Sequence, residues 1–299
     1  MTIKNVTIQG ISSSDLENVE MKILHCFSVP KYNEQMYKRS LQTLVLSFTW
    51  WNQPPLTSTE EMQLLSFFSN LTLLRTLKIE NKGMQSLAMS SESVLDKILS
   101  KYLLQAGCQN ISSVCISKCA SMPKTAYRYL SDGAAKQFFE QILASQQEIT
   151  EIALPDLGLR SDSISTLLYK VILRAPDQAG YAPVATDGEQ SQFQGCFKTL
   201  RVLNLQGNFL DQSQLDAKTF YSIFDFLENI EELNICRLKF QSFKTFKQQF
   251  LVDFVCNQDY KPYMNTLKRV NLNLGSEYFY AEGAPKMSYS SAKKVLDQF

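Results

Sequence analysis

The stretch Leu200-Arg-Val-Leu-Asn-Leu-Gln-Gly-Asn-Phe-Leu210 decides the fold. It places apolar residues at its first, fourth, sixth and eleventh positions and an asparagine at its ninth position. Because side chains alternate across a strand, the fourth and sixth positions would share one face and the fifth would lie on the other. One such match can arise by chance, so a repeat is predicted only if further copies occur at similar intervals.

Seven further copies of this eleven-residue template begin at residues 3, 41, 74, 111, 149, 230 and 267. Their key residues are Ile3, Val6, Ile8 and Ile11; Leu41, Leu44, Leu46, Thr49 and Trp51; Leu74, Leu77, Ile79, Lys82 and Met84; Ile111, Val114, Ile116 and Cys119; Ile149, Ile152, Leu154, Leu157 and Leu159; Ile230, Leu233, Ile235, Leu238 and Phe240; and Leu267, Val270, Leu272 and Gly275. Successive starts are 30 to 38 residues apart, except for one interval of 51 residues. Such a period indicates a repeat architecture.

The segments between the copies have the periodicity of amphipathic helices. These segments are residues 16–24, 62–68, 93–104, 133–144, 163–173, 216–229, 242–255 and 288–299. Several follow polar pairs such as Ser131-Asp132 and Ser161-Asp162, whose oxygens can cap the first amides of a helix. A single unit cannot bury both its strand and its helix, so stacking predicts a curved solenoid with parallel strands inside and helices outside. Eight strands at roughly 4.8 Å make an inner sheet about 35 Å long.

The template is similar to the L-x-x-L-x-L-x-x-N-x-L segment of leucine-rich repeats, and the similarity extends over essentially the whole chain. The long helical units resemble the ribonuclease-inhibitor-like branch of that family. The irregular repeats also resemble the leucine-rich-repeat effectors of intracellular bacterial pathogens. This resemblance implies an α/β horseshoe solenoid of about eight strand–helix repeats, in a single domain that covers residues 1–299.

The chain departs from the regular family pattern in two respects. Asparagine occupies the ninth position only at Asn208, so we expect the buried asparagine ladder to be largely missing and the superhelix to be less uniform. The 51-residue interval contains residues 175–195, which are rich in Pro, Gly, Gln and Asp. That composition predicts a mobile surface insertion loop, and a loop that clasps a partner is the alternative interpretation.

Composition excludes several classes of protein. Thirty basic residues against 29 acidic ones give a formal net charge of +1, which argues against a nucleic-acid partner. The first ten residues lack a secretory signal, and no stretch reaches the roughly 18 apolar residues of a membrane span. Seven cysteines without a framework spacing favour reduced thiols in a cytoplasmic protein. Secretion into a host cytosol without a cleavable signal stays open, because some bacterial effectors travel in that way.

No residue pattern predicts catalysis, a cofactor or a metal ion. The only histidine, His25, lies on a predicted helix, so no second histidine can complete a metal pair or a base relay. Cys115 and Cys119 fall on the strand template, where packing explains them. Phosphate-loop, dinucleotide and nucleophile-elbow motifs are absent from the sequence. The adjacent carboxylates of Glu231 and Glu232 are typical of a solvated surface.

The second, third, fifth, seventh and eighth template positions should face the concave side of the solenoid, because side chains alternate along a strand. We expect contacts with a partner on this face and its rim, since arginine and aromatic side chains often anchor protein interfaces. The candidate residues are Phe48, Trp50, Arg75, Lys78, Glu80, Glu151, Asp156, Arg201, Asn204, Phe209, Glu231, Glu232, Asn234, Arg237, Lys268, Arg269, Asn271, Tyr278, Phe279 and Tyr280. Asn204, Asn234 and Asn271 share the fifth position and should form one line.

These features predict a protein-interaction module, monomeric on its own, that binds one partner protein on its concave face. The resemblance implies inhibition or regulation of an enzyme, and a role as a bacterial effector or effector regulator. The alternative is a substrate-recognition adaptor of a larger host-type ligase complex. An enzyme is a distant third hypothesis, which would return if activity disappeared on changing Cys115 or Glu231 alone.

Overall fold

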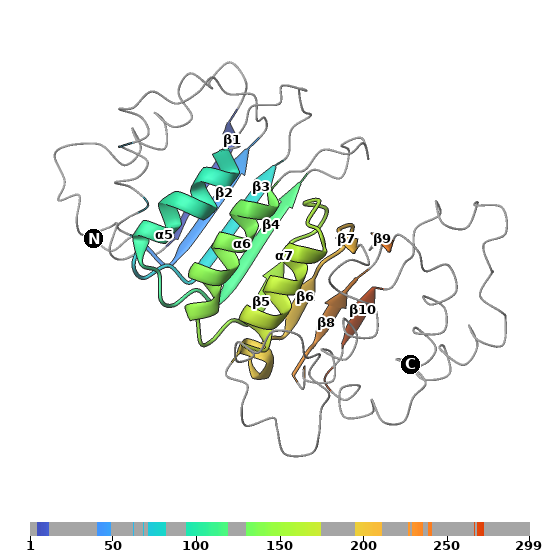
Figure 1. Ribbon diagram of the computed structural model, residues 1–299. Coiled ribbons are helices and arrows are strands. Elements are labelled where there is room, and N and C mark those ends of the chain that lie inside the picture. Colours follow the sequence, from blue (N-terminus) through green and yellow to red (C-terminus); the bar gives the residue numbers. More distant parts are fainter. Residues whose placement is uncertain are drawn as a thin grey trace, which may run out of the picture.

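The fold has two layers, a parallel β-sheet and a row of helices packed against one of its faces (Figure 1). This computed structural model describes residues 5–11, 41–48, 62, 68, 71–81, 94–118, 130–174, 195–210, 227, 229–235, 239–240, 266 and 268–271. Outside these residues lie the helices predicted at 16–24, 242–255 and 288–299, most of those predicted at 62–68 and 216–229, and the insertion predicted at 175–195 except Gly195.

The main sheet has eight strands, in the order β1-β2-β3-β4-β5-β6-β8-β10. The strands are β1 (Asn5–Ile11), β2 (Thr43–Phe48), β3 (Thr76–Asn81), β4 (Ser113–Lys118), β5 (Glu151–Ala153), β6 (Val202–Asn204), β8 (Glu232–Asn234) and β10 (Arg269–Asn271). All neighbours are parallel. A second sheet pairs β7 (Phe209–Leu210) with β9 (Lys239–Phe240). The predicted α/β class and parallel sheet are therefore confirmed.

The register of the sheet is the one that the template predicts. The fourth template position is paired across all eight strands, through Val6, Leu44, Leu77, Val114, Ile152, Leu203, Leu233 and Val270. A shift of one residue in any strand would turn its apolar set toward the opposite face, so burial of one face fixes this register.

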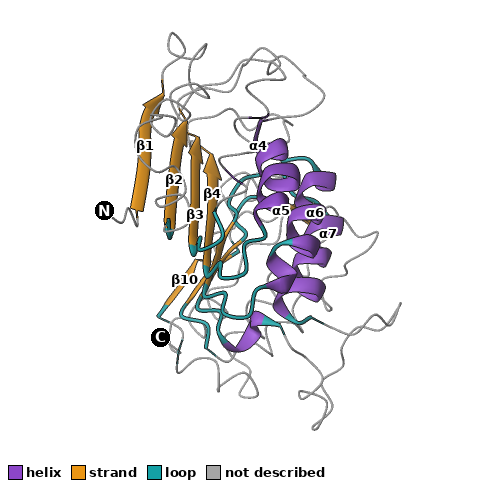
Figure 2. Cartoon of the chain, turned by 90° about the vertical axis from the view of Figure 1, so that its left-hand side faces the viewer, coloured by secondary structure: helices purple, strands orange, loops and turns teal. Residues whose placement is uncertain are grey.

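Helical segments cover one face of the sheet, and Figure 2 shows the strands and helices as separate layers. The first segment comprises α4 (Val94–Lys97), η2 (Ile98–Tyr102) and α5 (Leu103–Ala106); the second comprises α6 (Asp132–Gln141) and η3 (Leu143–Ser145); the third comprises α7 (Ser161–Thr166) and η4 (Leu167–Ile172). A short turn, η6 (Cys196–Lys198), precedes β6. In α6 the residues Ala134, Ala135, Phe138 and Phe139 are buried. Their spacing gives the apolar stripe that a helix needs to pack on a sheet.

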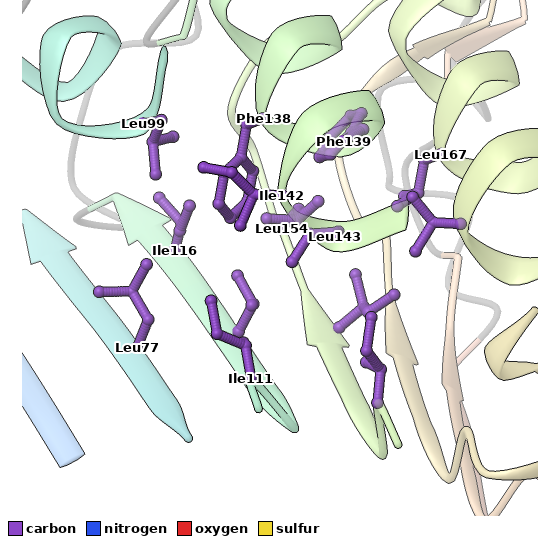
Figure 3. Packing of buried hydrophobic residues seen from close by; sticks show 14 of the residues in the cluster. Leu77, Leu99, Ile111, Ile116, Phe138, Phe139, Ile142, Leu143, Leu154 and Leu167 are labelled. Carbon is purple, nitrogen blue, oxygen red and sulfur yellow. The ribbon is translucent and has the colours of Figure 1, made fainter. Parts of the chain in front are cut away.

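The core lies between the two layers. Figure 3 shows Leu77, Ile116 and Leu154 of the sheet layer directed toward Phe138 and Leu167 of the helices. The sheet contributes the fourth and sixth template positions, which are buried wherever their burial is described: Leu44, Leu46, Leu77, Ile79, Val114, Ile116, Ile152, Leu154, Leu203, Leu205, Leu233 and Ile235. The apolar repeat pattern therefore corresponds to one continuous core across successive units.

Two predicted helix caps have different outcomes. Ser131 is the N-cap of α6, because its side chain accepts a hydrogen bond from the amide of Ala134 at 3.2 Å. The prediction for Ser161 is wrong by one residue, since Arg160 is the N-cap of α7 and Ser161 is buried inside the helix. Asp132 Oδ1, on the neighbouring helix, accepts bonds from the amide of Arg160 at 3.3 Å and the hydroxyl of Ser163 at 2.9 Å at this end of α7.

Two buried amide side chains link neighbouring turns. Asn208 is fully buried; its Nδ2 donates to the carbonyls of Leu154 and Leu205 at 2.8 and 3.0 Å, and its Oδ1 accepts from the amide of Leu159 at 3.1 Å. This is the link that the ninth template position predicts. Gln146 makes a comparable link in the loops before the strands, which the template does not predict. Its Oε1 accepts from the amide of Ile111, and its Nε2 donates to the carbonyls of Cys108 and Ile142. Buried backbone groups need such partners, so both amides fix the spacing of successive units.

Candidate functional site

The candidate site is the face of the eight-stranded sheet turned away from α5, α6 and α7, which we call the polar face (Figure 2). Its third, fifth and seventh template positions are half-buried or exposed wherever their burial is described, except Ala153, which is buried, whereas the fourth and sixth positions are buried. Seven predicted site residues occupy these positions and are half-buried or exposed: Lys78, Glu80, Glu151, Asn204, Glu232, Asn234 and Arg269. Four more, Arg75, Arg201, Glu231 and Lys268, lie one residue before β3, β6, β8 and β10, and are also half-buried or exposed. Asn271 lies in β10, and Asp156 is half-buried in the turn after β5. The eleven side chains are therefore at least partly accessible to solvent.

Charged side chains alternate in sign across β6, β8 and β10. Glu231 accepts Arg201 Nη1 on Oε1 at 2.9 Å and Lys268 Nζ on Oε2 at 2.7 Å. One position further along, Arg269 Nη1 contacts Glu232 Oε2 at 3.0 Å. The Lys268 ammonium, assisted by the Arg201 guanidinium, lowers the pKa of the Glu231 carboxyl. Opposite charges that meet across neighbouring strands stabilise this pairing and fix the positions of the long cationic side chains.

A second group of charges lies on β3 to β5. Lys78 Nζ contacts Glu80 Oε1 at 2.8 Å, and the Ser113 hydroxyl donates to Glu151 Oε2 at 2.6 Å. The bond to Glu80 is the main reason that the pKa of Lys78 is raised. Cys115 pairs in register with Lys78, and burial together with the Glu151 carboxylate raises the pKa of its thiol. This part of the face therefore presents an ion pair, a bonded carboxylate and a neutral thiol.

The predicted line of asparagines is present, but its amides are partly engaged within the protein. Asn204 and Asn234 are paired in register on neighbouring strands, and Asn271 is paired with Asn234. Asn234 Nδ2 donates to Gln206 Oε1 at 2.9 Å, and Gln206 Nε2 donates to Asp156 Oδ2 at 3.3 Å. Gln206 was not among the predicted site residues, although it occupies the seventh template position. Side-chain hydrogen bonds therefore link Asn234 through Gln206 to Asp156 in the turn after β5.

No protein-family model matches this chain, and no curated protein matches it either.

The remaining predicted site residues lie elsewhere. Phe48 ends β2, paired with Asn81 of β3. Phe209 lies in β7 and pairs with Lys239, so it belongs to the small sheet rather than to the eight-stranded one. Trp50, Arg237, Tyr278, Phe279, Tyr280 and the lone histidine, His25, lie outside the described residues.

Burial raises the pKa of Cys108 to about 11 and that of Cys196 to about 12, so both thiols are protonated and weakly nucleophilic near neutral pH. Within the described ranges, no three His, Cys, Asp or Glu side chains are grouped to hold a metal ion. No helix in that part of the chain is long and apolar enough to cross a membrane. The polar face carries charged groups and amides that are held by ion pairs and hydrogen bonds.

Proposed function

We propose that the chain is a leucine-rich-repeat solenoid of the ribonuclease-inhibitor-like branch that binds a partner protein on its polar face. Three observations support the repeat architecture. The template residues pair in register across eight parallel strands that follow one another in chain order. The helices described between β3 and β6 lie on one face of the sheet (Figure 1). Asn208 forms the buried link expected at the ninth template position. In such a solenoid the polar face is the concave face.

The continuity of the polar face is the observation that carries the proposed binding function. Eight strands at about 4.8 Å give a surface about 35 Å long, which suits a protein surface better than a small metabolite. Its charges are held by ion pairs on β3, β6, β8 and β10 rather than buried in a catalytic cleft. Fixed charges of both signs favour the orientation and rate of docking with a complementary protein. Arginine side chains such as Arg201 supply anchors of the type that often dominates binding energy.

The proposal is tested by affinity capture from a cell lysate, with quantitative mass spectrometry of the bound proteins. The polar-face variant carries Lys78→Glu, Arg201→Glu and Lys268→Glu. The matched control carries the same change at three lysines of the helical layer, Lys97→Glu, Lys101→Glu and Lys170→Glu. Both variants change the net charge equally, and circular dichroism checks that each is folded.

The account predicts that one protein is captured in stoichiometric amount by the wild type and by the helix control. The polar-face variant should capture at least about tenfold less of that protein, because reversed charges at an interface repel the partner. Equal capture by the polar-face variant, with loss by the helix control, would place the binding surface on the helices and refute the proposal.

A further inference from the structure

Three cations on the polar face are much more exposed than the carboxylates that hold them. The side chains of Arg201, Lys268 and Arg269 are 62%, 71% and 73% exposed. Their partners Glu231 and Glu232 are 25% and 39% exposed. The carboxylates therefore lie nearer the sheet, and the positive groups form the outer surface of this end of the polar face. We call Arg201, Lys268 and Arg269 the cation triad.

We infer that the cation triad binds an acidic segment of the partner protein, one that presents clustered aspartate or glutamate side chains. This inference rests on the proposed function, because it specifies the chemistry of the partner on the same face. Three cations face two carboxylates across β6, β8 and β10, so one positive charge is left in excess. The excess charge lies on the side that a partner approaches, and it attracts a carboxylate-bearing surface.

The triad is arranged before any partner arrives. Glu231 bonds Arg201 Nη1 through Oε1 and Lys268 Nζ through Oε2, so the two cationic groups converge on one carboxylate although β8 separates β6 from β10. Each guanidinium has five N–H donors, so an arginine that bonds a glutamate through Nη1 can still donate to a second carboxylate. Cations that are already positioned lose less side-chain freedom on binding, which favours affinity.

An acidic protein segment fits this surface better than a nucleic acid does. A phosphate backbone needs a continuous row of cations, because each neutralised phosphate contributes to affinity. Here Glu231 and Glu232 stand between the cations, so the cations form no continuous row. Carboxylates on flexible side chains can reach the three cations separately and avoid both glutamates. The near-neutral net charge of +1 agrees with this choice.

The experiment measures binding of a fluorescein-labelled hexaglutamate peptide to the full chain by fluorescence anisotropy at low ionic strength. The triad variant carries Arg201→Gln, Lys268→Gln and Arg269→Gln. The control carries Lys97→Gln, Lys101→Gln and Lys170→Gln, which remove the same charge from the helical layer. We expect the triad variant to bind roughly tenfold more weakly than the wild type, since each exposed ion pair contributes modestly. The control should stay within about twofold of the wild type.

A third variant, Glu231→Gln, should change peptide binding in the opposite direction. It removes the carboxylate that competes for Arg201 and Lys268, so hexaglutamate should bind about threefold more tightly than to the wild type. Equal loss in the triad and control variants, or weaker binding to Glu231→Gln, would overturn the inference. An oligothymidylate of equal charge that binds the triad as tightly as the peptide would also overturn it, in favour of nucleic acid.

The two proposals fail in distinguishable ways. If hexaglutamate does not bind but the polar-face variant loses its partner in the lysate experiment, the acidic-partner inference fails and the proposed function stands. If the peptide binds the triad but lysate capture is unchanged in the polar-face variant, the proposed function fails, and the inference that depends on it fails too.

Discussion

Replacement of Asn208 by leucine should strongly destabilise the fold, because this buried amide bridges two successive units. Its side chain makes three hydrogen bonds to backbone groups of Leu154, Leu205 and Leu159, at 2.8 to 3.1 Å. Leucine cannot make them, and a buried backbone group without a partner is costly. Steric strain is a minor factor, since Leu157 occupies the same template position one unit earlier and is buried there.

The expected loss follows from the number of bonds. Three neutral hydrogen bonds at about 1 kcal/mol each give a loss of about 3 kcal/mol in the free energy of unfolding. In a chain of this size the corresponding decrease in melting temperature is about 6 °C. Urea unfolding followed by circular dichroism, together with a thermal melt, measures both quantities.

The matched control is Asn229→Ala. Asn229 is exposed, and its Nδ2 donates to the carbonyl of Lys198 at 2.7 Å. Water can replace that partner, so the control should lose less than about 1 kcal/mol. If Asn208→Leu cost no more than this control, Asn208 would not be the link between units, and the structural basis of the repeat at this position would be wrong.

Three further predictions concern the same strands and turns. Glu231→Gln should lower the free energy of unfolding at pH 7, because ion pairs lower the pKa of Glu231 in the folded state. The difference from the wild type should be fully present above pH 4.5 and disappear as the pH falls through the folded pKa. A difference that persisted in acid would contradict this prediction. Gly207→Ala should cost about 2 kcal/mol in urea unfolding, since φ is +72° and the new Cβ would lie 1.9 Å from Asp156 Oδ1; an unchanged midpoint would refute this conformation. Iodoacetamide at pH 8, read by peptide mass spectrometry, should modify half-buried Cys115 before Cys196, whose burial raises its pKa to about 12, and the opposite order would be inconsistent with the fold.

The sequence predicts the sheet well because two template positions, the fourth and the sixth, mark the buried face of each strand. The fourth and sixth template positions must be buried together, and the period of two residues allows only one register. Leu77, Val114 and Ile152 therefore pair as the template aligns them. Asn208 was also predictable, since a polar side chain at a buried ninth position needs backbone partners.

The contacts between units were harder to predict, because they depend on side chains far apart in the chain. At the start of α7 the pair Ser161-Asp162 predicts the wrong N-cap. Asp132 of the neighbouring helix, far away in the chain, accepts bonds from Arg160 and Ser163 there. Gln146 links return loops that carry no template position. The charges at the start of β6, β8 and β10 could be recognised in the sequence, because Arg201, Glu231 and Lys268 share the second template position in three successive copies. That alternation becomes an ion-pair row only once the register is known.

The central claim is that a partner covers the polar face and leaves the helices free. Lysine acetylation, read by peptide mass spectrometry on the chain alone and in complex with its captured partner, tests this claim most directly. Lys78 and Lys268 report on the polar face, and Lys101 and Lys170 report on the helical layer under the same reagent. The account predicts that the partner slows acetylation of the first pair several-fold and leaves the second pair unchanged. Protection of the helix lysines, with unchanged labelling of Lys78 and Lys268, would contradict it.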